Sequence, residues 1–370
     1  MSKNNEGITV ANNKDGLDVT IVREDHTTIN FFDSVHDLVK SLVRDDLLFI
    51  IDNKVLELYK DVLEPIVKNS PVFAIDVTEK EKSWENLAAI LEDATKHKIS
   101  RKGAIVAIGG GVITDMAGLA SNLYFRGIRS ILVPTSLLAM VDAAIGGKVA
   151  VNHPYQKNMI GSFYHPTEVL VAPEFLQTAE KRHVYSAAGE IVKLAILSDT
   201  ELFSLVENAP KNWEQDQEFL QKVVRLCIHE KLTMLGANCF ERDLKRPLNL
   251  GHSVAHPLED ITDFAIFHGE AVAYGLLIAS NISLQRGLLS KQDFERIYKA
   301  ARDFGCTVHA TNFDKELLWE RIRRLIAQRG GTGLLYVLPT TIGDATIVKD
   351  ITKDELFNAI EALAKLTKAI

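Results

Sequence analysis

The sequence predicts an α/β protein with an N-terminal Rossmann-like domain, built on a parallel sheet, and a C-terminal mainly helical domain. Short apolar runs alternate with helical patterns in the first half of the chain, as in parallel βαβ units. A glycine triplet, Gly109–Gly111, joins one of these runs to a helix-like segment. Long amphipathic segments dominate from about Arg182 onward. We therefore expect one domain at residues 1–180 and a second at 181–370.

Short apolar runs supply the predicted strands. They span residues 17–22, 47–51, 72–77, 104–108, 130–134 and 169–172. The run 104–108 is continuously apolar between two glycines, which is typical of a strand buried on both faces of a parallel sheet. Helical patterns follow at 55–67, from Trp84 and from Val112.

The second half reads as a set of long helices. The amphipathic segments span residues 187–197, 216–235, 271–286, 291–304 and 315–327. A cleft between an α/β domain and a helical domain is the default place to expect an active site.

Composition excludes several classes of protein. The 370 residues suffice for two domains, and contents of 46% hydrophobic and 25% charged residues are ordinary globular values. A net charge of −7 argues against a nucleic-acid surface. Three cysteines without C-x-x-C spacing suggest reduced thiols. With no visible targeting signal and no apolar stretch long enough to span a bilayer, we expect a cytoplasmic protein without membrane contact.

Polar residues at the ends of the predicted strands are candidates for cofactor binding. Gly110 and Gly111 lie where backbone amides approach a phosphate, although GGGxxxD is not the usual GxGxxG and a tight turn without a ligand is an equal alternative. Asp52 and Asn53 end one strand, at the edge where open α/β folds bind nucleotides. Thr135 and Ser136 follow another strand and are placed to hydrogen-bond a cofactor.

A cluster of cations and amides follows within about fifty residues. On loops marked by glycine and proline, we expect the side chains of Arg126, Asp142, Lys148, Asn152, Lys157 and Asn158. Such a mixture suits a phosphate or a polyol. A solvated basic loop explains each lysine singly, but not the dense mixture of Gly, Lys and Asn.

The helical half carries candidate metal ligands. Glu190 and Lys193 share one predicted helix, and His252 and His256 are four apart, so they project from one face. Ser253 stands where a zinc protease motif needs glutamate, which argues against protease chemistry. A lone histidine is more often a packed or capping residue. Three histidines and a glutamate beside glycines favour a metal site.

Several motifs occur in the order found in a known superfamily. GGGVITDMAG, YFRGIR, VPTSLLAMVDAAIGGKVAVNHPYQKNMIGSFYHP and AAGEIVK resemble the sugar phosphate cyclases, whose archetype is 3-dehydroquinate synthase, over about residues 52–272. The resemblance implies NAD, zinc (with Co²⁺ possible) and a homodimer. It implies a reaction that turns a seven-carbon ketose phosphate into a carbocycle with loss of phosphate and return of the hydride.

The resemblance also assigns roles to residues. The implied metal ligands are Glu190, His252 and His268. The implied catalytic residues are Lys148, Lys193, Lys231, Asn249 and His256. The implied substrate contacts are Arg126, Asp142, Lys148, Asn158, Lys231, Lys245, Asn249 and His256, with Arg126 reaching the partner subunit's site. The implied or predicted cofactor contacts are Asp52, Asn53, Glu79, Lys82, Gly110, Gly111, Asp115, Thr135, Ser136, Asp142, Lys157 and Thr178. For Glu79 and Lys82, a solvated loop is the plainer interpretation.

Three departures surround the expected substrate. The motif that usually reads GHTxGHAxE in dehydroquinate synthases reads GHSVAHPLE here. Lys245, beside Arg246, replaces an arginine that holds the substrate carboxylate in those enzymes. Their C-terminal Asp-Lys-Lys is absent, and Arg329 is a candidate substitute for its phosphate lysine. The cations at Lys231 and Lys245–Arg246 favour 3-dehydroquinate synthase.

Alternatives remain. One is a sedoheptulose 7-phosphate cyclase making a valiolone-type cyclitol. A metal-dependent polyol dehydrogenase would accumulate NADH and would not need the phosphate set. A non-catalytic sugar-phosphate-binding protein would retain no metal.

Overall fold

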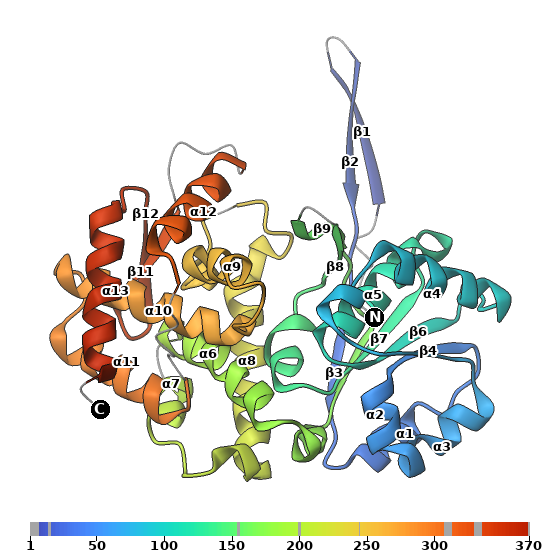
Figure 1. Ribbon diagram of the computed structural model, residues 1–370. Coiled ribbons are helices and arrows are strands. Elements are labelled where there is room, and N and C mark those ends of the chain that lie inside the picture. The colour runs from blue at the N-terminus through green and yellow to red at the C-terminus, as the bar shows by residue number, and fades with distance from the viewer. Residues whose placement is uncertain are drawn as a thin grey trace.

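The chain folds around one large parallel sheet and a group of helices beside it (Figure 1). The structure is a computed structural model that describes residues 7–13, 16–153, 156–198, 201–243, 245–306, 313–328 and 335–368. The sheet has six strands in the order β3-β10-β7-β6-β4-β5, and every pairing is parallel. The strands are β3 (Thr28–Phe31), β4 (Leu47–Asp52), β5 (Val72–Ile75), β6 (Ala104–Gly109), β7 (Arg129–Pro134) and β10 (Glu168–Val171). The predicted fold class is confirmed.

The strand predicted to be fully buried lies at the centre of this sheet. Every residue of β6 is buried, between β4 and β7, because helices cover both faces of the sheet and leave no side for polar residues. The helices of this half are α1 (Val35–Ser41), α2 (Asn53–Leu58), α3 (Lys60–Asn69), α4 (Trp84–Lys96) and α5 (Gly111–Leu123).

One predicted helix is divided in two. The pattern at 55–67 predicted a single helix, but Tyr59 has φ −113° and ψ 26° and separates α2 from α3. The break coincides with a tertiary contact: the Tyr59 ring packs edge-on against Phe175 at 4.9 Å, and its hydroxyl lies 3.1 Å from Thr178 Oγ1. The contact of Tyr59 with a distant segment therefore interrupts the helix that the sequence periodicity predicted.

The segment predicted as loops between Lys148 and Asn158 is a β-hairpin, so that prediction was wrong. β8 (Lys148–His153) pairs antiparallel with β9 (Gln156–Phe163). Val149 and Val151 are buried and Ala150 between them is less buried, and this period of two is the signature of a strand with one face on the core. The hairpin packs against α5 and so presents Lys148, Lys157 and Asn158 from a rigid element.

The second half is mainly helical, as predicted. Its helices are α6 (Lys181–Leu197), α7 (Glu201–Glu207), α8 (Gln217–Leu235), α9 (His252–Ile261), α10 (His268–Gln285), α11 (Lys291–Asp303), α12 (Lys315–Gln328) and α13 (Lys353–Lys368). α10 is central and packs against α6, α9, α11 and α13. A hairpin of β11 (Tyr336–Thr341) and β12 (Asp344–Val348) was not predicted. The domain division near residue 180 remains a proposal.

Short helical turns and a second hairpin complete the chain. The turns are η1 (Glu79–Glu81), η2 (Tyr124–Arg126), η3 (Ala139–Ala143), η4 (Pro173–Thr178), η5 (Trp213–Gln215), η6 (Gly236–Asn238) and η7 (Pro247–Asn249). β1 (Gly7–Asn13) and β2 (Gly16–Val22) form an antiparallel hairpin that projects from the body of the molecule (Figure 1). No helix in the described part of the chain combines the length and apolar character needed to cross a bilayer.

Candidate active site

A cleft of about 1540 Å³ lies between the sheet and the helical half. Most of the residues predicted from the sequence to bind cofactor or substrate line it. Those in the lining are Asp52, Glu79, Lys82, Gly110, Gly111, Asp115, Thr135, Ser136, Asp142, Lys148, Lys157, Asn158, Thr178, Lys231, His256 and His268. Residues from both halves of the chain therefore share one cavity.

Other predicted residues lie outside the lining, for different reasons. Glu190 and Lys193 are buried behind the cleft wall, and His252 is largely buried there as well. Asn53 donates its side-chain N–H to Asp76 Oδ1 at 2.9 Å. Arg126, Lys245 and Asn249 are also absent from the lining; Arg126 and Lys245 are exposed, and Asn249 is half-buried.

The glycine turn forms the floor of the cleft on the sheet side. Gly110 precedes the first turn of α5 without a side-chain cap, so the amides at this helix start are available to an anion. A Cβ on Gly111 would lie 3.2 Å from Ala143 Cβ, and one on Gly110 would lie 3.4 Å from Ser136 Oγ. Glycine at both positions keeps this floor open for a close approach to backbone.

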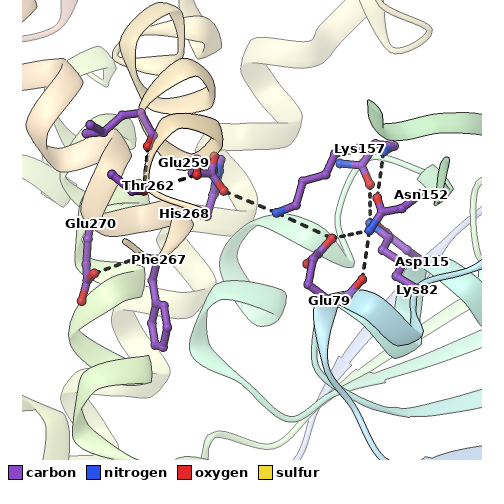
Figure 2. A network of polar contacts seen from close by, with 12 residues as sticks. Glu79, Lys82, Asp115, Asn152, Lys157, Glu259, Thr262, Phe267, His268 and Glu270 are labelled. Atoms are coloured by element: carbon purple, nitrogen blue, oxygen red, sulfur yellow. Dashed lines mark hydrogen bonds and ion pairs between the residues drawn. The ribbon is translucent and has the colours of Figure 1, made fainter. Parts of the chain in front are cut away.

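Lys82 ties α5 to the β8–β9 hairpin. Its buried ammonium donates to Asp115 Oδ2 and to Asn158 Oδ1, both at 2.5 Å. Burial raises the pKa of Asp115 to about 6, against the attraction of Lys82. Asn152 Nδ2 donates to Glu79 Oε1 at 2.7 Å, and this contact joins the hairpin to η1 (Figure 2). The predicted polar residues thus hold one another in place around the cavity.

Three side chains from three helices converge as candidate metal ligands. One ligand atom each from Glu190 on α6, His252 on α9 and His268 on α10 lie within 4.8 Å of one another. His252 Nε2 is 3.4 Å and His268 Nε2 is 3.3 Å from Glu190 Oε1. Neither oxygen of the buried Glu190 carboxylate receives a well-formed hydrogen bond, although Lys193 forms an ion pair with it. A buried carboxylate with unsatisfied oxygens facing two imidazoles is a suitable donor set for a divalent cation.

The outer nitrogens of both imidazoles are held by acceptors. His268 Nδ1 donates to Glu259 Oε2 at 3.0 Å, and His252 Nδ1 donates to the Leu250 carbonyl at 3.2 Å. Because each acceptor takes a proton from Nδ1, each Nε2 faces Glu190 and would offer its lone pair to a bound metal ion. A second group, His256, Glu259 and His268, also has its ligand atoms within 4.8 Å. This second group shares His268 with the first, and its carboxylate, Glu259, already accepts a hydrogen bond from the His268 ring. We therefore favour the Glu190 group as the metal site.

Close backbone contacts at glycines bring the three ligands together. Gly189 precedes Glu190, and a Cβ there would lie 1.9 Å from the Gly269 carbonyl oxygen. Gly269 follows His268, so α6 and α10 touch backbone to backbone beside two of the ligands. Gly251 precedes His252 with φ +81°, and its Cβ would lie 2.7 Å from the Val272 carbonyl oxygen. Only glycine permits this approach, which explains why glycines adjoin all three ligands.

Charges around Glu190 keep it ionised. Burial by itself would raise the pKa of Glu190, but the Lys193 ammonium and the two histidines outweigh burial and hold the pKa well below its usual range. Attraction by Glu190 and Asp142 likewise outweighs burial and raises the pKa of Lys193. Lys193 therefore acts as a buried cation that keeps the carboxylate in its anionic form, the form that a metal ion would require.

Lys148 and Lys231 line the cleft where an anionic substrate would meet cations. Lys231 Nζ donates to Asp142 Oδ1 at 2.7 Å and to the Asp142 carbonyl at 2.6 Å. Lys148 Nζ lies 2.5 Å from Glu241 Oε1. Desolvation, together with the charge of Lys231, lowers the pKa of Lys148 to about 8.

Sequence reasoning missed two acidic residues of this site. Glu259 orients His268, and the spacing His256-x-x-Glu259 within a helix was the signal for it, since residues three apart share a face. Glu259 also lies 3.7 Å from Lys157 Nζ, which extends between Glu259 and Glu79 (Figure 2). Glu241 pairs with both Lys148 and Arg246. No motif in the sequence marked Glu241, because Lys148 is distant in sequence and Arg246 lies in the same irregular segment as Glu241.

Comparisons with known proteins agree with this geometry. Residues 72–186 match the model of the 3-dehydroquinate synthase N-terminal region, and residues 187–326 match that of its C-terminal region. A 3-dehydroquinate synthase of Helicobacter pylori (strain HPAG1) is 34% identical over 328 residues, covering 88% of this chain and 94% of its own. A 2-epi-valiolone synthase of Stigmatella aurantiaca is 34% identical over 374 residues, covering 95% and 92%.

A solved structure extends the likeness to three dimensions. ValA, a 2-epi-5-epi-valiolone synthase from Streptomyces hygroscopicus subsp. jinggangensis with NAD⁺ and Zn²⁺ bound, superimposes with a TM-score of 0.86. The two share 28% identity, over 94% of this chain and 99% of ValA. A parallel sheet and a helical metal-ligand group that meet at one cleft, with such relatives, define an enzyme of the sugar phosphate cyclase class, which eliminates phosphate. Within that class, the chain belongs to the 3-dehydroquinate synthase family.

Proposed function

We propose that this protein is an NAD- and zinc-dependent cyclase that converts a seven-carbon ketose phosphate into a carbocycle with loss of phosphate. The particular reaction we propose is that of 3-dehydroquinate synthase, from 3-deoxy-arabino-heptulosonate 7-phosphate to 3-dehydroquinate. The observation that carries the proposal is the convergence of Glu190, His252 and His268 beside a cleft that the Gly110–Gly111 turn also lines. The bound NAD⁺ and Zn²⁺ of ValA support it.

The residues present fit both groups. Zinc, or Co²⁺, would be held by Glu190 Oε and the two histidine Nε2 atoms, which is the three-ligand set of a catalytic site with positions left for substrate oxygens. NAD would lie along the glycine turn, with its phosphates at the start of α5. When bound, the metal would acidify a substrate hydroxyl, and the nicotinamide would accept and return a hydride.

The remaining cofactor contacts are proposed at the carboxyl edge of the sheet. Asp52, Asn53, Glu79 and Lys82 would surround the adenosine ribose. Thr135, Ser136 and Thr178 would donate hydroxyl hydrogen bonds, while Asp115, Asp142 and Lys157 would complete the pocket. Nearly all of these residues line the cleft, which supports the assignment.

The chain's own cations would handle the departing phosphate. Lys148, Asn158 and His256 line the cleft and would neutralise charge that grows on the leaving group. Lys148 would exchange its contact with Glu241 for the substrate. Lys231, held by Asp142, would orient the ring hydroxyls or a carboxylate, with Asn249 and Lys245 at the carboxylate end. Lys193 would act through Glu190 as a positioning residue.

A specific observation favours a second substrate. Lys245 is exposed, and neither it nor Asn249 lines the cleft, so a substrate carboxylate would lack two of its expected partners. A sedoheptulose 7-phosphate cyclase has no carboxylate to bind. The 2-epi-valiolone synthase relative also covers 95% of the chain.

The two substrates are tested side by side. The zinc- and NAD-loaded protein is incubated with 3-deoxy-arabino-heptulosonate 7-phosphate and, separately, with sedoheptulose 7-phosphate, and released phosphate and product mass are measured. We expect 3-dehydroquinate from the first. A cyclitol from the second would support the alternative, and no carbocycle from either would refute the proposal. Glu190→Gln controls for contaminating phosphatase, because it should abolish cyclisation of both.

Three broader expectations accompany this proposal. We propose that two copies associate and that Arg126 reaches the neighbouring copy's phosphate site. Its exposed side chain and left-handed φ of +64°, which a non-glycine residue seldom adopts, support a partner contact there. We also propose a domain division near residue 180, where the sheet has ended and α6 begins, and action in the cytoplasm.

A further inference from the structure

Helix α12 contributes two arginines to the cleft that no sequence motif marked. α12 packs against α9, the helix that carries His252 and His256. Arg321 Nε lies 3.2 Å from Asp260 Oδ2 on α9, and both residues line the cleft. Arg324 follows three residues later, so it lies on the same face of the helix, and it lines the cleft as well.

Most cations of the cleft already have an acidic partner. Seven lysine and arginine side chains line it. Five lie within 4.0 Å of a carboxylate, namely Lys82, Lys148, Lys157, Lys231 and Arg321. The other two are Lys54, which follows β4 at the nucleotide end of the sheet, and Arg324, which belongs to the helical wall with His256. Within the described ranges, Arg324 is thus the guanidinium of the helical wall that has no carboxylate within 4.0 Å.

We propose that Arg324, positioned by the Arg321–Asp260 pair, binds the phosphate group of the ketose phosphate. The proposal rests on the proposed function and adds a residue to its substrate site. A guanidinium offers a planar pair of N–H donors that matches a phosphate dianion, and an unpaired one facing a cavity gains most from an anion. His256, proposed above as a phosphate contact, lines the same wall.

This placement also answers a question raised by the sequence. The Asp-Lys-Lys that would bring a phosphate lysine is absent, and Arg329, considered as its substitute, lies outside the described residues. Arg324 lies in the last turns of α12, just before the segment where that lysine was expected. Arg324, extending from α12, would therefore take the place of the phosphate lysine that the segment after α12 was expected to supply.

The test measures binding of inorganic phosphate to the zinc- and NAD-loaded protein by calorimetry, together with kcat and KM for the ketose phosphate. Arg324→Gln removes the charge and should weaken phosphate binding about 5- to 20-fold and raise KM similarly, with a smaller fall in kcat, as for one charge-assisted contact at a partly solvated position. Arg324→Lys should recover part of the loss. Arg323→Gln is the matched control, since Arg323 is exposed on the same helix but does not line the cleft.

Each result is decisive. Arg324→Gln binding phosphate as tightly as Arg323→Gln would overturn the proposal, and so would equal losses in both variants, which would indicate a general charge effect. Thermal unfolding and the Arg324→Lys protein separate a binding defect from misfolding. If the unaltered protein binds phosphate through Arg324 but cyclises neither ketose, the proposed function fails while this phosphate site stands.

Discussion

The contact between Gly189 and Gly269 predicts a sensitive position beside the metal ligands. In Gly189→Ala the new Cβ would lie 1.9 Å from the Gly269 carbonyl oxygen, whereas real Cβ contacts below 3.0 Å are essentially never seen. The obstacle is backbone, which no side-chain rotation can remove. The α6–α10 contact must therefore open by about 1 Å or more.

Opening this contact separates Glu190 from His268. Ligand distances in a metal site hold to within about 0.2 Å, so a shift of this size removes one ligand from a shared ion. We expect zinc affinity to fall about 100-fold or more, the upper end of what changes around the ligands cost. Overpacking should also lower the free energy of unfolding of the metal-free protein by about 1–3 kcal/mol.

The assay is competition for zinc with a chromophoric chelator, with thermal unfolding recorded with and without the metal. Ala195→Gly is the control: Ala195 is buried on the same helix, and glycine there costs about 1 kcal/mol of stability without adding an atom at the contact. It should keep its zinc affinity. Native zinc affinity in Gly189→Ala, or an equal loss in the control, would refute the reasoning.

Three further predictions follow from the site. Glu259→Ala removes the acceptor of His268 Nδ1, and we expect zinc affinity, measured by chelator competition, to fall about 10- to 100-fold. Glu259→Gln keeps an acceptor and should lose less zinc affinity. Unchanged zinc affinity in Glu259→Ala would contradict the proposed orientation of His268. Lys148, with a pKa of about 8, is charged below that pH and neutral above it, so KM for the ketose phosphate should rise as the pH passes 8. In Lys148→Arg the rise in KM should move to higher pH. Identical pH profiles of KM in the two proteins would exclude Lys148 as the source of the rise. Arg126→Ala should weaken phosphate binding if two copies share the site, and unchanged phosphate affinity would remove that role.

Local patterns in the sequence predicted five of the six strands of the sheet and most of the long helices, but not β3 (Thr28–Phe31) or α13 (Lys353–Lys368). The run 104–108 is apolar at every position and lies in the middle of the sheet, where no residue meets water. The break at Tyr59 could not be predicted, because its cause is a contact with Phe175 and Thr178, over a hundred residues away. The β8–β9 hairpin was missed because its glycines, proline and asparagines read as loop residues, although Val149 and Val151 alternate as a strand requires.

The site divides in the same way. Residue types favoured a metal site among Glu190 and three histidines, the family resemblance implied Glu190, His252 and His268 as its ligands, and the structure brings these three together. The Glu241 contact with Lys148 and the arginines of α12 depend on how distant segments meet, which no local pattern encodes. Lys245 shows the opposite case, since the family resemblance implied a substrate contact, yet its side chain is exposed and outside the cleft lining.

The central claim is that the metal group, the nucleotide turn and the phosphate cations work on one substrate in one cleft, with NAD restored in every cycle. The most direct measurement follows inorganic phosphate and NADH together, with NAD limiting and whichever ketose phosphate is turned over in excess. We expect many phosphates to be released per NAD, with no accumulation of NADH. NADH accumulating in step with product, without phosphate release, would contradict it and identify a dehydrogenase instead.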